Sequence, residues 1–328
     1  MTVIGAGSWG TALAILLARE GHPTQLWGRD AAQLDAMRLS GSNQRYLPDA
    51  LFPATLRITA DLGEALKDAR DALIAVPSHA FRATLVRIRP HLDAQTRIAW
   101  ATKGFEIASG MLPHQVVHEV LGARPGAVLS GPTFAREVGA GLPTAMTVAS
   151  RDEHFARELA LSLSGPRFRA YTQNDILGVE VGGAVKNVIA IGSGIADGMG
   201  YGANTRVALI TRGLAEMMRL GVKHGAQRET FMGLAGLGDL VLTCTDDQSR
   251  NRRFGIALGL GRSPAEAESA IHQVVEGVPA ARAVRDVAQR LGVDMPICRE
   301  IYHIVYENKP VRDAVQALMG RELRSEPE

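Results

Sequence analysis

The chain has 328 residues, a formal net charge of +2 and only two cysteines, Cys244 and Cys298. This length fits two domains, and the small net charge disfavours a nucleic-acid-binding protein, which needs clustered basic surface. Two cysteines are too few for a disulfide framework, which favours a reducing compartment. The longest apolar run is interrupted by Glu180, Lys186 and Asn187, so it does not reach the roughly 18 residues needed to cross a bilayer. With no leader before it, we expect a soluble cytoplasmic protein.

The first predicted elements are a strand, a glycine turn and a helix. Residues 2–4 are β-branched, Gly5, Gly7 and Gly10 follow in the spacing G-x-G-x-x-G, and an alanine- and leucine-rich segment continues to Arg19. In a dinucleotide-binding turn these glycines allow the tight bend, the approach of a pyrophosphate and close helix packing. The helix N-terminus would offer free N–H groups to the phosphates. The alternative is a glycine turn that only packs.

The second predicted strand, residues 23–27, ends in Gly28, Arg29 and Asp30. An acidic residue at this tip holds the ribose of NAD, whereas a basic one accommodates the 2′-phosphate of NADP. Arg29 fills the tip and Asp30 comes slightly late, so we expect NADP, or use of both cofactors with NADPH favoured. The alternative is an ordinary exposed arginine.

Strand and helix patterns alternate through the first half of the chain. Further strands are predicted at 72–76, 97–101, 127–130, 145–149 and 167–171, with helices such as 80–88 and 112–121 between them. This alternation predicts a doubly wound, Rossmann-like parallel sheet. Helical pattern dominates after Gln173. We therefore expect a dinucleotide-binding domain over residues 1–172 and an all-α substrate-binding and catalytic domain over residues 173–328.

Polar clusters follow several of these strands, where ligands of such sheets bind. They occupy residues 76–79, 101–106 and 130–135. Lys103 in the second cluster is a candidate contact for a substrate oxygen or phosphate, or else a solvated loop lysine. His114 and His118 lie four residues apart on a predicted helix, but without a third ligand we expect solvent-facing histidines and no metal.

An unusual lysine lies in the predicted helix over residues 178–204. Lys186 shares a helix face with small residues, and three glycines, Gly182, Gly183 and Gly194, imply close approach by another helix or by a ligand. Apolar surroundings disfavour an ammonium group, which suits a proton donor near neutral pH. The alternative is a lysine whose stem packs while its head reaches water.

Polar and glycine-rich segments continue beyond this helix. A predicted glycine turn at 233–238 leads to Asp239, and residues 249–253 read Ser-Arg-Asn-Arg-Arg. Arginine guanidinium groups bind phosphate through two parallel hydrogen bonds, and a helix starting at these residues would add free backbone N–H groups. The alternative is a basic, solvent-exposed turn. Residues 274–277 precede another predicted helix. Cys244 is interpreted as a packing residue.

Together these motifs resemble the bacterial NAD(P)-dependent sn-glycerol-3-phosphate dehydrogenase family along nearly the whole chain. The family usually has a few more residues before Val3, and serine is common where Thr133 stands here. The motifs are GAGSWGTALA from Gly5, ATKGFE from Ala101, SGPTFAREVGAGLPTA from Ser130, KNVIAIGSGIADGMGYGANTRVALITRGLAEM from Lys186, AGLGDLVLTCT from Ala235, SRNRRFG from Ser249 and VVEG from Val274.

The resemblance implies a cytoplasmic homodimer that interconverts dihydroxyacetone phosphate and sn-glycerol 3-phosphate for glycerophospholipid synthesis. It implies that Lys186 is the proton donor and acceptor. Implied substrate contacts are Lys103, Gly131, Thr133, Lys186, Asp239, Ser249, Arg250 and Asn251. Implied cofactor contacts, besides the glycines of the first turn, are Ser8, Trp9, Arg29, Lys103, Ala135, Arg250, Val274 and Glu276.

Two other functions stay open. One is a related two-domain dehydrogenase acting on a hydroxy acid or a ketopantoate-like substrate, which needs less cationic anchoring than a phosphate does. The other is a non-catalytic dinucleotide sensor that dimerises through its helical domain.

Overall fold

The computed structural model describes residues 1–271 and 273–322; the charged end of the chain, 323–328, lies outside them. The chain divides into two compact units. Unit 1 comprises Met1–Lys103 and Pro113–Ile176, and unit 2 comprises Gly104–Leu112 and Leu177–Glu328. Each unit has its own hydrophobic core.

Unit 1 is built on an 8-stranded sheet in the order β10-β9-β8-β7-β6-β1-β2-β5, with a small hairpin of β3 and β4 beside it. Every strand predicted from the sequence is present, within a few residues of its expected bounds. The strands are β1 (Thr2–Ile4), β2 (Thr24–Trp27), β3 (Ser42–Asn43), β4 (Leu47–Leu51), β5 (Leu56–Thr59), β6 (Asp71–Ile74), β7 (Arg97–Trp100), β8 (Gly126–Ser130), β9 (Thr144–Ser150) and β10 (Phe168–Gln173).

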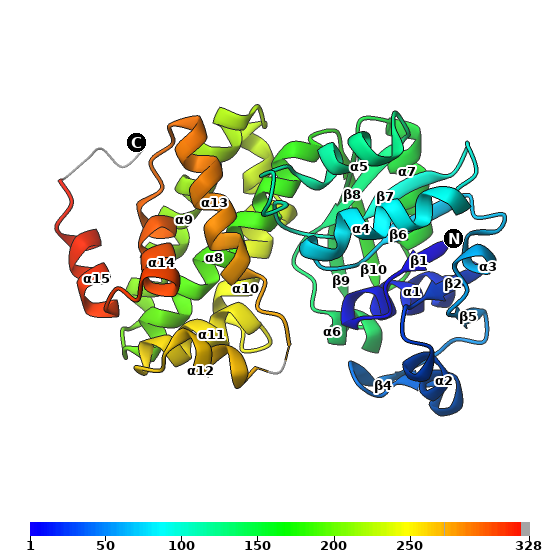
Figure 1. Ribbon diagram of the computed structural model, residues 1–328, viewed down its shortest axis with the longest axis horizontal. Helices are drawn as coiled ribbons and strands as arrows, with labels where there is room; N and C mark the ends of the chain where they lie inside the picture. The colour runs from blue at the N-terminus through cyan, green and yellow to red at the C-terminus, as the bar shows by residue number, and fades with distance from the viewer. Residues whose placement is uncertain (272, 323–328) are drawn as a thin grey trace. The chain divides into compact units, whose positions relative to one another are not determined.

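Helices cover both faces of this sheet, which confirms the doubly wound fold (Figure 1). Alternate strand residues serve the two faces: Val3 packs in a core with α1, whereas the neighbouring Ile4 is equally buried outside that cluster. The helices of unit 1 are α1 (Ser8–Arg19), α2 (Ala31–Ser40), α3 (Leu62–Leu66), α4 (Ser78–Ile88), η1 (Arg89–His91), α5 (Pro113–Leu121), α6 (Ala135–Ala140) and α7 (Glu153–Leu163).

One strand pair of the predicted parallel sheet is antiparallel. Strand β9 pairs antiparallel with β8, and β10 then pairs parallel with β9. Antiparallel neighbours need no crossover connection, so the segment containing the six-residue helix α6 returns the chain directly beside β8. The other strand pairs of this sheet are parallel.

Unit 2 is helical, as predicted: the strands within the described residues all belong to unit 1. The predicted glycine turn at 233–238 is instead one turn of π-helix, η3, that leads into α10. The elements are α8 (Ile176–Gly198), α9 (Ala203–His224), η2 (Arg228–Met232), η3 (Leu234–Gly238), α10 (Asp239–Thr245), α11 (Arg250–Gly259), α12 (Pro264–Ser269), α13 (Gly277–Leu291), α14 (Pro296–Glu307) and α15 (Val311–Met319).

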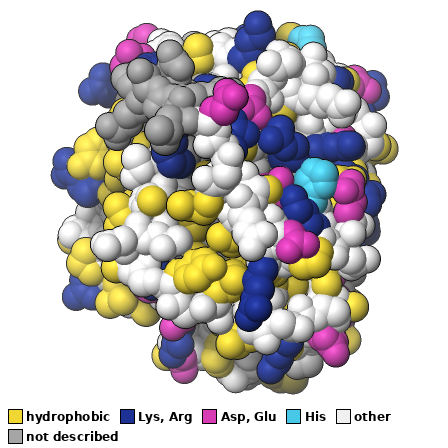
Figure 2. All heavy atoms as spheres, turned by 90° about the vertical axis from the view of Figure 1, so that its left-hand side faces the viewer, with side chains coloured by type: hydrophobic (Ala, Val, Ile, Leu, Met, Phe, Trp, Pro, Cys, Tyr) yellow, Lys and Arg dark blue, Asp and Glu magenta, His cyan; other side chains and the backbone are white. Residues whose placement is uncertain are grey.

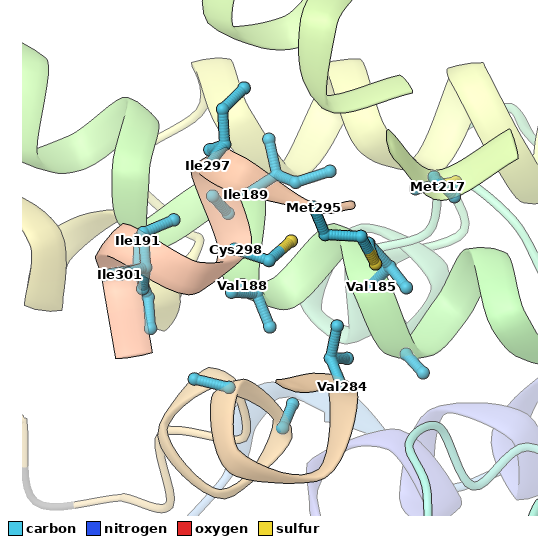
Figure 3. Close-up of a cluster of buried hydrophobic side chains, with 14 of the residues drawn as sticks. Val185, Val188, Ile189, Ile191, Met217, Val284, Met295, Ile297, Cys298 and Ile301 are labelled. Carbon is cyan, nitrogen blue, oxygen red and sulfur yellow. The ribbon is translucent and has the colours of Figure 1, made fainter. Parts of the chain in front are cut away.

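Helix α8 is the centre of unit 2. Val185, Val188 and Ile189 pack among side chains of α9, α13 and α14 (Figure 3). The sequence had indicated that polar residues interrupt this segment too often for a bilayer span; α8 is in fact long and apolar enough by length and composition, but 94% of its most apolar window is buried. It is the core helix of this unit, and it ends at Gly198 rather than continuing to Asn204.

The glycines of α8 serve contacts with other protein segments. A Cβ on Gly194 would overlap the carbonyl oxygen of Arg252 at the start of α11, and one on Gly255 of α11 would overlap the carbonyl of Ile191. A Cβ on Gly182 would lie 2.6 Å from the carbonyl oxygen of Ala235 in η3. Of the two alternatives predicted for Gly182 and Gly194, the approaching body is therefore a neighbouring helix.

Two further features of unit 2 were not predicted. Phe105 and Leu112, from the excursion between β7 and α5, are buried in its core. In addition, apolar side chains gather on the face formed by α9, α14 and α15 (Figure 2), around a cavity of about 470 Å³ lined by residues such as Leu209, Ile301 and Leu318.

Candidate active site

The glycine turn of unit 1 has the geometry that its spacing predicts. Gly5 adopts φ +121°, where a side chain would be strained, and a Cβ there would lie 2.7 Å from the carbonyl oxygen of Ala75. A Cβ on Gly10 would overlap the carbonyl oxygen of Gly5, so α1 packs directly on the turn. A Cβ on Gly7 would meet no atom within 4 Å, which leaves the space beside this residue open.

This turn fits a dinucleotide pyrophosphate. Gly7 is the N-cap of α1 and supplies no side-chain cap, so the first N–H groups of the helix are available to an anion. Among the described residues, the buried indole nitrogen Nε1 of Trp9 has no hydrogen-bond partner. A buried donor without an acceptor is costly, and an oxygen of a bound cofactor would remove that cost. Ser8 opens the same helix.

The tip of β2 presents a basic rather than an acidic side chain. Arg29 is exposed, while Asp30 caps α2 by accepting a hydrogen bond from the Gln33 backbone N–H at 3.1 Å. Asp30 is therefore used by the fold as a helix cap. Arg29 is the residue here whose charge suits a 2′-phosphate.

The remaining unit 1 candidates lie after strands of the sheet. Lys103 is half-buried just beyond β7. Gly131 follows β8 with φ +152°, and a Cβ there would lie 2.9 Å from Cα of Met146. The Thr133 hydroxyl donates to the carbonyl of Gly131 at 3.3 Å, and Ala135 begins α6.

In unit 2, Lys186 is buried and bonded at its ammonium group. It is 7% exposed, and its Nζ forms an ion pair with Oδ1 of Asp239 and donates to Oγ1 of Thr243 at 3.0 Å. Asp239 is the first residue of α10 and is 1% exposed. The sequence suggested an apolar setting, but the ammonium group lies against a buried carboxylate and a hydroxyl. Lys186 therefore does not send its charged group out to water.

Thr243 stands one helical turn after Asp239 and was not identified from the sequence. Its hydroxyl donates to the Asp239 backbone carbonyl at 2.6 Å, so a lone pair of the same oxygen is left for Lys186. Cys244 beside it is fully buried, and burial raises the pKa of its thiol to about 12. A thiol held neutral is no nucleophile, so this cysteine packs.

The cluster at residues 249–253 begins a helix and divides between packing and exposure. Ser249 caps α11 by accepting from the Arg252 backbone N–H at 3.2 Å. Arg252 is buried and paired with Asp197 at 2.6 Å and with Asp247. Its guanidinium thus ties α11 to α8, and only Arg250 and Arg253 of the three arginines remain for a ligand.

Asn251 joins three helices. Its Nδ2 donates to Oδ1 of Asn187 at 2.9 Å, and its Oδ1 accepts from the Gly277 backbone N–H, the first of α13, at 2.8 Å. Arg250 is held close by, because its guanidinium donates to the backbone carbonyl of Val274 at 3.1 Å. Neither Asn187 nor these long-range bonds could be found from local sequence pattern.

The structure thus brings several candidates of unit 2 together. Asn251, bonded to Asn187, links the start of α11 to the residue after Lys186. Glu276 precedes α13 as predicted, and Val274 lies two residues earlier. No group of metal-ligating side chains occurs among residues 1–271 and 273–322; His114 is half-buried and His118 is exposed.

Comparison with known proteins covers both units. The family description "NAD-dependent glycerol-3-phosphate dehydrogenase N-terminus" matches residues 1–156, and the corresponding C-terminus description matches residues 175–316. A glycerol-3-phosphate dehydrogenase [NAD(P)+] of Edwardsiella ictaluri is 57% identical over 328 residues, which span 99% of this chain and 97% of that protein.

Solved structures agree with this. The glycerol-3-phosphate dehydrogenase of Coxiella burnetii is 49% identical, with a TM-score of 0.94 and 98% of each chain covered. A ketopantoate reductase of Ralstonia eutropha is 16% identical with a TM-score of 0.61, covering 96% of this chain and 100% of that one. At that identity the likeness concerns the fold alone.

Proposed function

The chain belongs to the NAD-dependent glycerol-3-phosphate dehydrogenase family, and from this premise we propose that it reduces dihydroxyacetone phosphate to sn-glycerol 3-phosphate, reversibly, with NAD(P)H. The observation that carries the proposal is the buried Lys186–Asp239 pair. The residue after Lys186, Asn187, is bonded to Asn251 at the start of α11. Most of the proposed cofactor contacts belong to unit 1, whereas most of the proposed substrate contacts and the proton donor, Lys186, belong to unit 2. The product is the backbone of glycerophospholipids.

Lys186 provides the acid for this reaction. When a nicotinamide cofactor is bound, it supplies the hydride for the carbonyl carbon. Negative charge then develops on the substrate oxygen, and the Lys186 ammonium stabilises this charge and donates a proton to it. Asp239 and Thr243 fix the position of Nζ. In the reverse direction the neutral amine accepts the proton from the alcohol.

The substrate phosphate is held at the start of α11. Arg250 offers a planar guanidinium for bidentate contact, and its bond to the Val274 carbonyl limits its freedom before substrate arrives. Ser249 and Asn251 complete this anchor, with Lys103, Gly131 and Thr133 as further substrate contacts. Anchoring the phosphate keeps the carbonyl in place for reaction.

The cofactor is held by the glycine turn of unit 1. Gly5 makes the bend of this turn, Gly7 leaves room for the pyrophosphate and Gly10 lets α1 pack closely. Ser8 and Trp9 are further cofactor contacts. We expect NADPH to be favoured, because Arg29 is exposed at the tip of β2 and no acidic side chain there remains uncommitted, Asp30 being a helix cap. Further contacts are expected from Lys103, Ala135, Arg250, Val274 and Glu276.

Steady-state kinetics with NADPH and with NADH test this function. The purified protein is expected to oxidise the reduced cofactor with dihydroxyacetone phosphate but not with a 2-oxo acid or ketopantoate. A preference for a carboxylate substrate would favour the hydroxyacid or ketopantoate alternative. Cofactor binding without turnover on any of these substrates would favour a non-catalytic sensor.

We also expect a cytoplasmic homodimer. The apolar face of α9, α14 and α15 supports self-association, since large exposed apolar patches are uncommon on monomers (Figure 2). Met319 on α15 is 81% exposed. A Met319→Arg variant should shift the protein towards monomer in light scattering, whereas Leu39→Arg, at a 91% exposed position in unit 1, should not. A monomeric wild-type protein would contradict this.

A further inference from the structure

One backbone carbonyl in the glycine turn receives two side-chain amides. The carbonyl oxygen of Ala6 accepts from Nε2 of Gln33 on α2 and from Nδ2 of Asn43 on β3, both at 3.2 Å. Asn43 also donates to Oγ1 of Thr11 in α1 at 2.8 Å. It is fully buried, so it connects the turn, the first helix and the small hairpin from within the protein.

The orientation of the Asn43 amide follows from its partners. A carbonyl oxygen can only accept, so the NH₂ group must face Ala6. This leaves Oδ1 buried with no hydrogen-bond partner among residues 1–271 and 273–322. An unpaired buried acceptor costs free energy, and an apolar residue of similar size would avoid that cost. What Asn43 contributes is therefore its donor group.

Holding the Ala6 carbonyl also sets the direction of the next N–H group. The peptide bond between Ala6 and Gly7 is planar and trans, so the carbonyl and the Gly7 N–H point in opposite directions. With the oxygen bonded to α2 and β3, the N–H of Gly7 is turned away from them. The space beside Gly7 is open, and successive backbone N–H groups before a helix are what a pyrophosphate contacts.

We propose that Asn43 is a positioning residue for the dinucleotide: its amide fixes the Ala6–Gly7 peptide in the orientation that binds the cofactor's pyrophosphate. This inference rests on the proposed function, because it assumes that the turn binds NADPH or NADH. The pyrophosphate is common to both cofactors. Loss of the Asn43 amide therefore weakens both equally, whereas loss of Arg29 changes their ratio.

The test compares Asn43→Leu with wild-type protein by measuring the dissociation constants of NADPH and NADH directly, without substrate. The net value of such hydrogen bonds corresponds to up to about tenfold in affinity, and we expect both constants to rise by about that factor. kcat and the KM for dihydroxyacetone phosphate should stay within about twofold. Arg29→Ala should weaken NADPH alone, and Gln44→Ala, on the exposed part of the same hairpin, should change neither.

Gln33→Leu keeps the test informative if Asn43→Leu folds poorly, because Gln33 is only partly buried and donates to the same carbonyl. It should weaken both cofactors in the same proportion, by less. Unchanged cofactor affinity in folded Asn43→Leu and Gln33→Leu overturns the inference, as does a loss confined to one cofactor. A wild-type protein that binds neither cofactor instead overturns the proposed function.

Discussion

Replacing Lys186 with methionine separates its chemical role from its structural one. Methionine keeps much of the length and volume of the lysine stem but removes the ammonium. In the proposed reaction the substrate oxygen then loses its proton donor, which costs at least about a hundredfold in kcat/KM. The same change leaves the Asp239 carboxylate, 1% exposed, without its cation.

The size of that second effect follows from burial. Removing one partner of a buried ion pair destabilises a protein by about 3–5 kcal/mol, and a neutral hydroxyl such as that of Thr243 does not replace the missing charge. Changing Asp239 to asparagine in the same molecule removes the uncompensated carboxylate. The double variant Lys186→Met/Asp239→Asn should therefore recover most of the lost stability and none of the lost rate.

The assay pairs urea denaturation with NADPH oxidation for the wild type, both single variants and the double variant. Circular dichroism confirms that each is folded before its rate is measured. A Lys186→Met protein within tenfold of the wild-type rate would refute the proton-donor role. A double variant as unstable as Lys186→Met would refute the assigned cost of the unpaired carboxylate.

Three further outcomes are expected. Arg250→Ala should raise the KM for dihydroxyacetone phosphate by roughly tenfold or more, as expected for a lost charge-assisted contact, with a smaller change in kcat; an unchanged KM would remove Arg250 from the phosphate anchor. Gly7→Ala should leave the melting temperature nearly unchanged while weakening NADPH binding, because a Cβ added at Gly7 meets no atom within 4 Å. Gly10→Ala should destabilise the fold, because a Cβ added there overlaps the Gly5 carbonyl, and equal effects of the two variants on stability would contradict this reasoning. Burial raises the pKa of the Glu216 carboxyl to about 7 from 4.5. The contribution of this group to the free energy of unfolding is therefore fully present below pH 4.5, and up to about 3 kcal/mol of it is lost as the pH rises to 7. In urea titrations at several pH values, Glu216→Gln should gain stability relative to wild type over this interval, and a difference that does not change with pH would contradict the raised pKa.

Local pattern was sufficient for much of unit 1. The β-branched strand, the glycine spacing and the helix beyond Gly10 are contiguous in the sequence, so each supports the others. Strands β3 to β5 were not predicted. In β4 the reason is that Pro48 and an exposed Asp49 leave no clear alternation of apolar residues, and β3 has only 2 residues. The antiparallel direction of β9 depends on how the chain returns across the sheet, which composition does not encode.

The sequence indicated the candidate site as a set of residue types but not as a set of contacts. Lys186 stood out because it interrupts an apolar helix. Its bonds to Asp239 and Thr243 join residues 53 and 57 positions apart, and only the packing of α10 on α8 brings them together. Similarly, the sequence could not show that Arg252 is buried in an ion pair with Asp197 while Arg250 is only half-buried.

Chemical rescue tests the central role of Lys186 most directly. Lys186→Ala removes the side chain that carries the ammonium and leaves space for a small primary amine. Adding methylamine or ethylamine should restore NADPH oxidation with dihydroxyacetone phosphate in proportion to the concentration of the ammonium form, and should not restore Asp239→Ala, which retains the lysine. A Lys186→Ala protein that binds substrate and cofactor but gains no rate from either amine would contradict proton donation by Lys186.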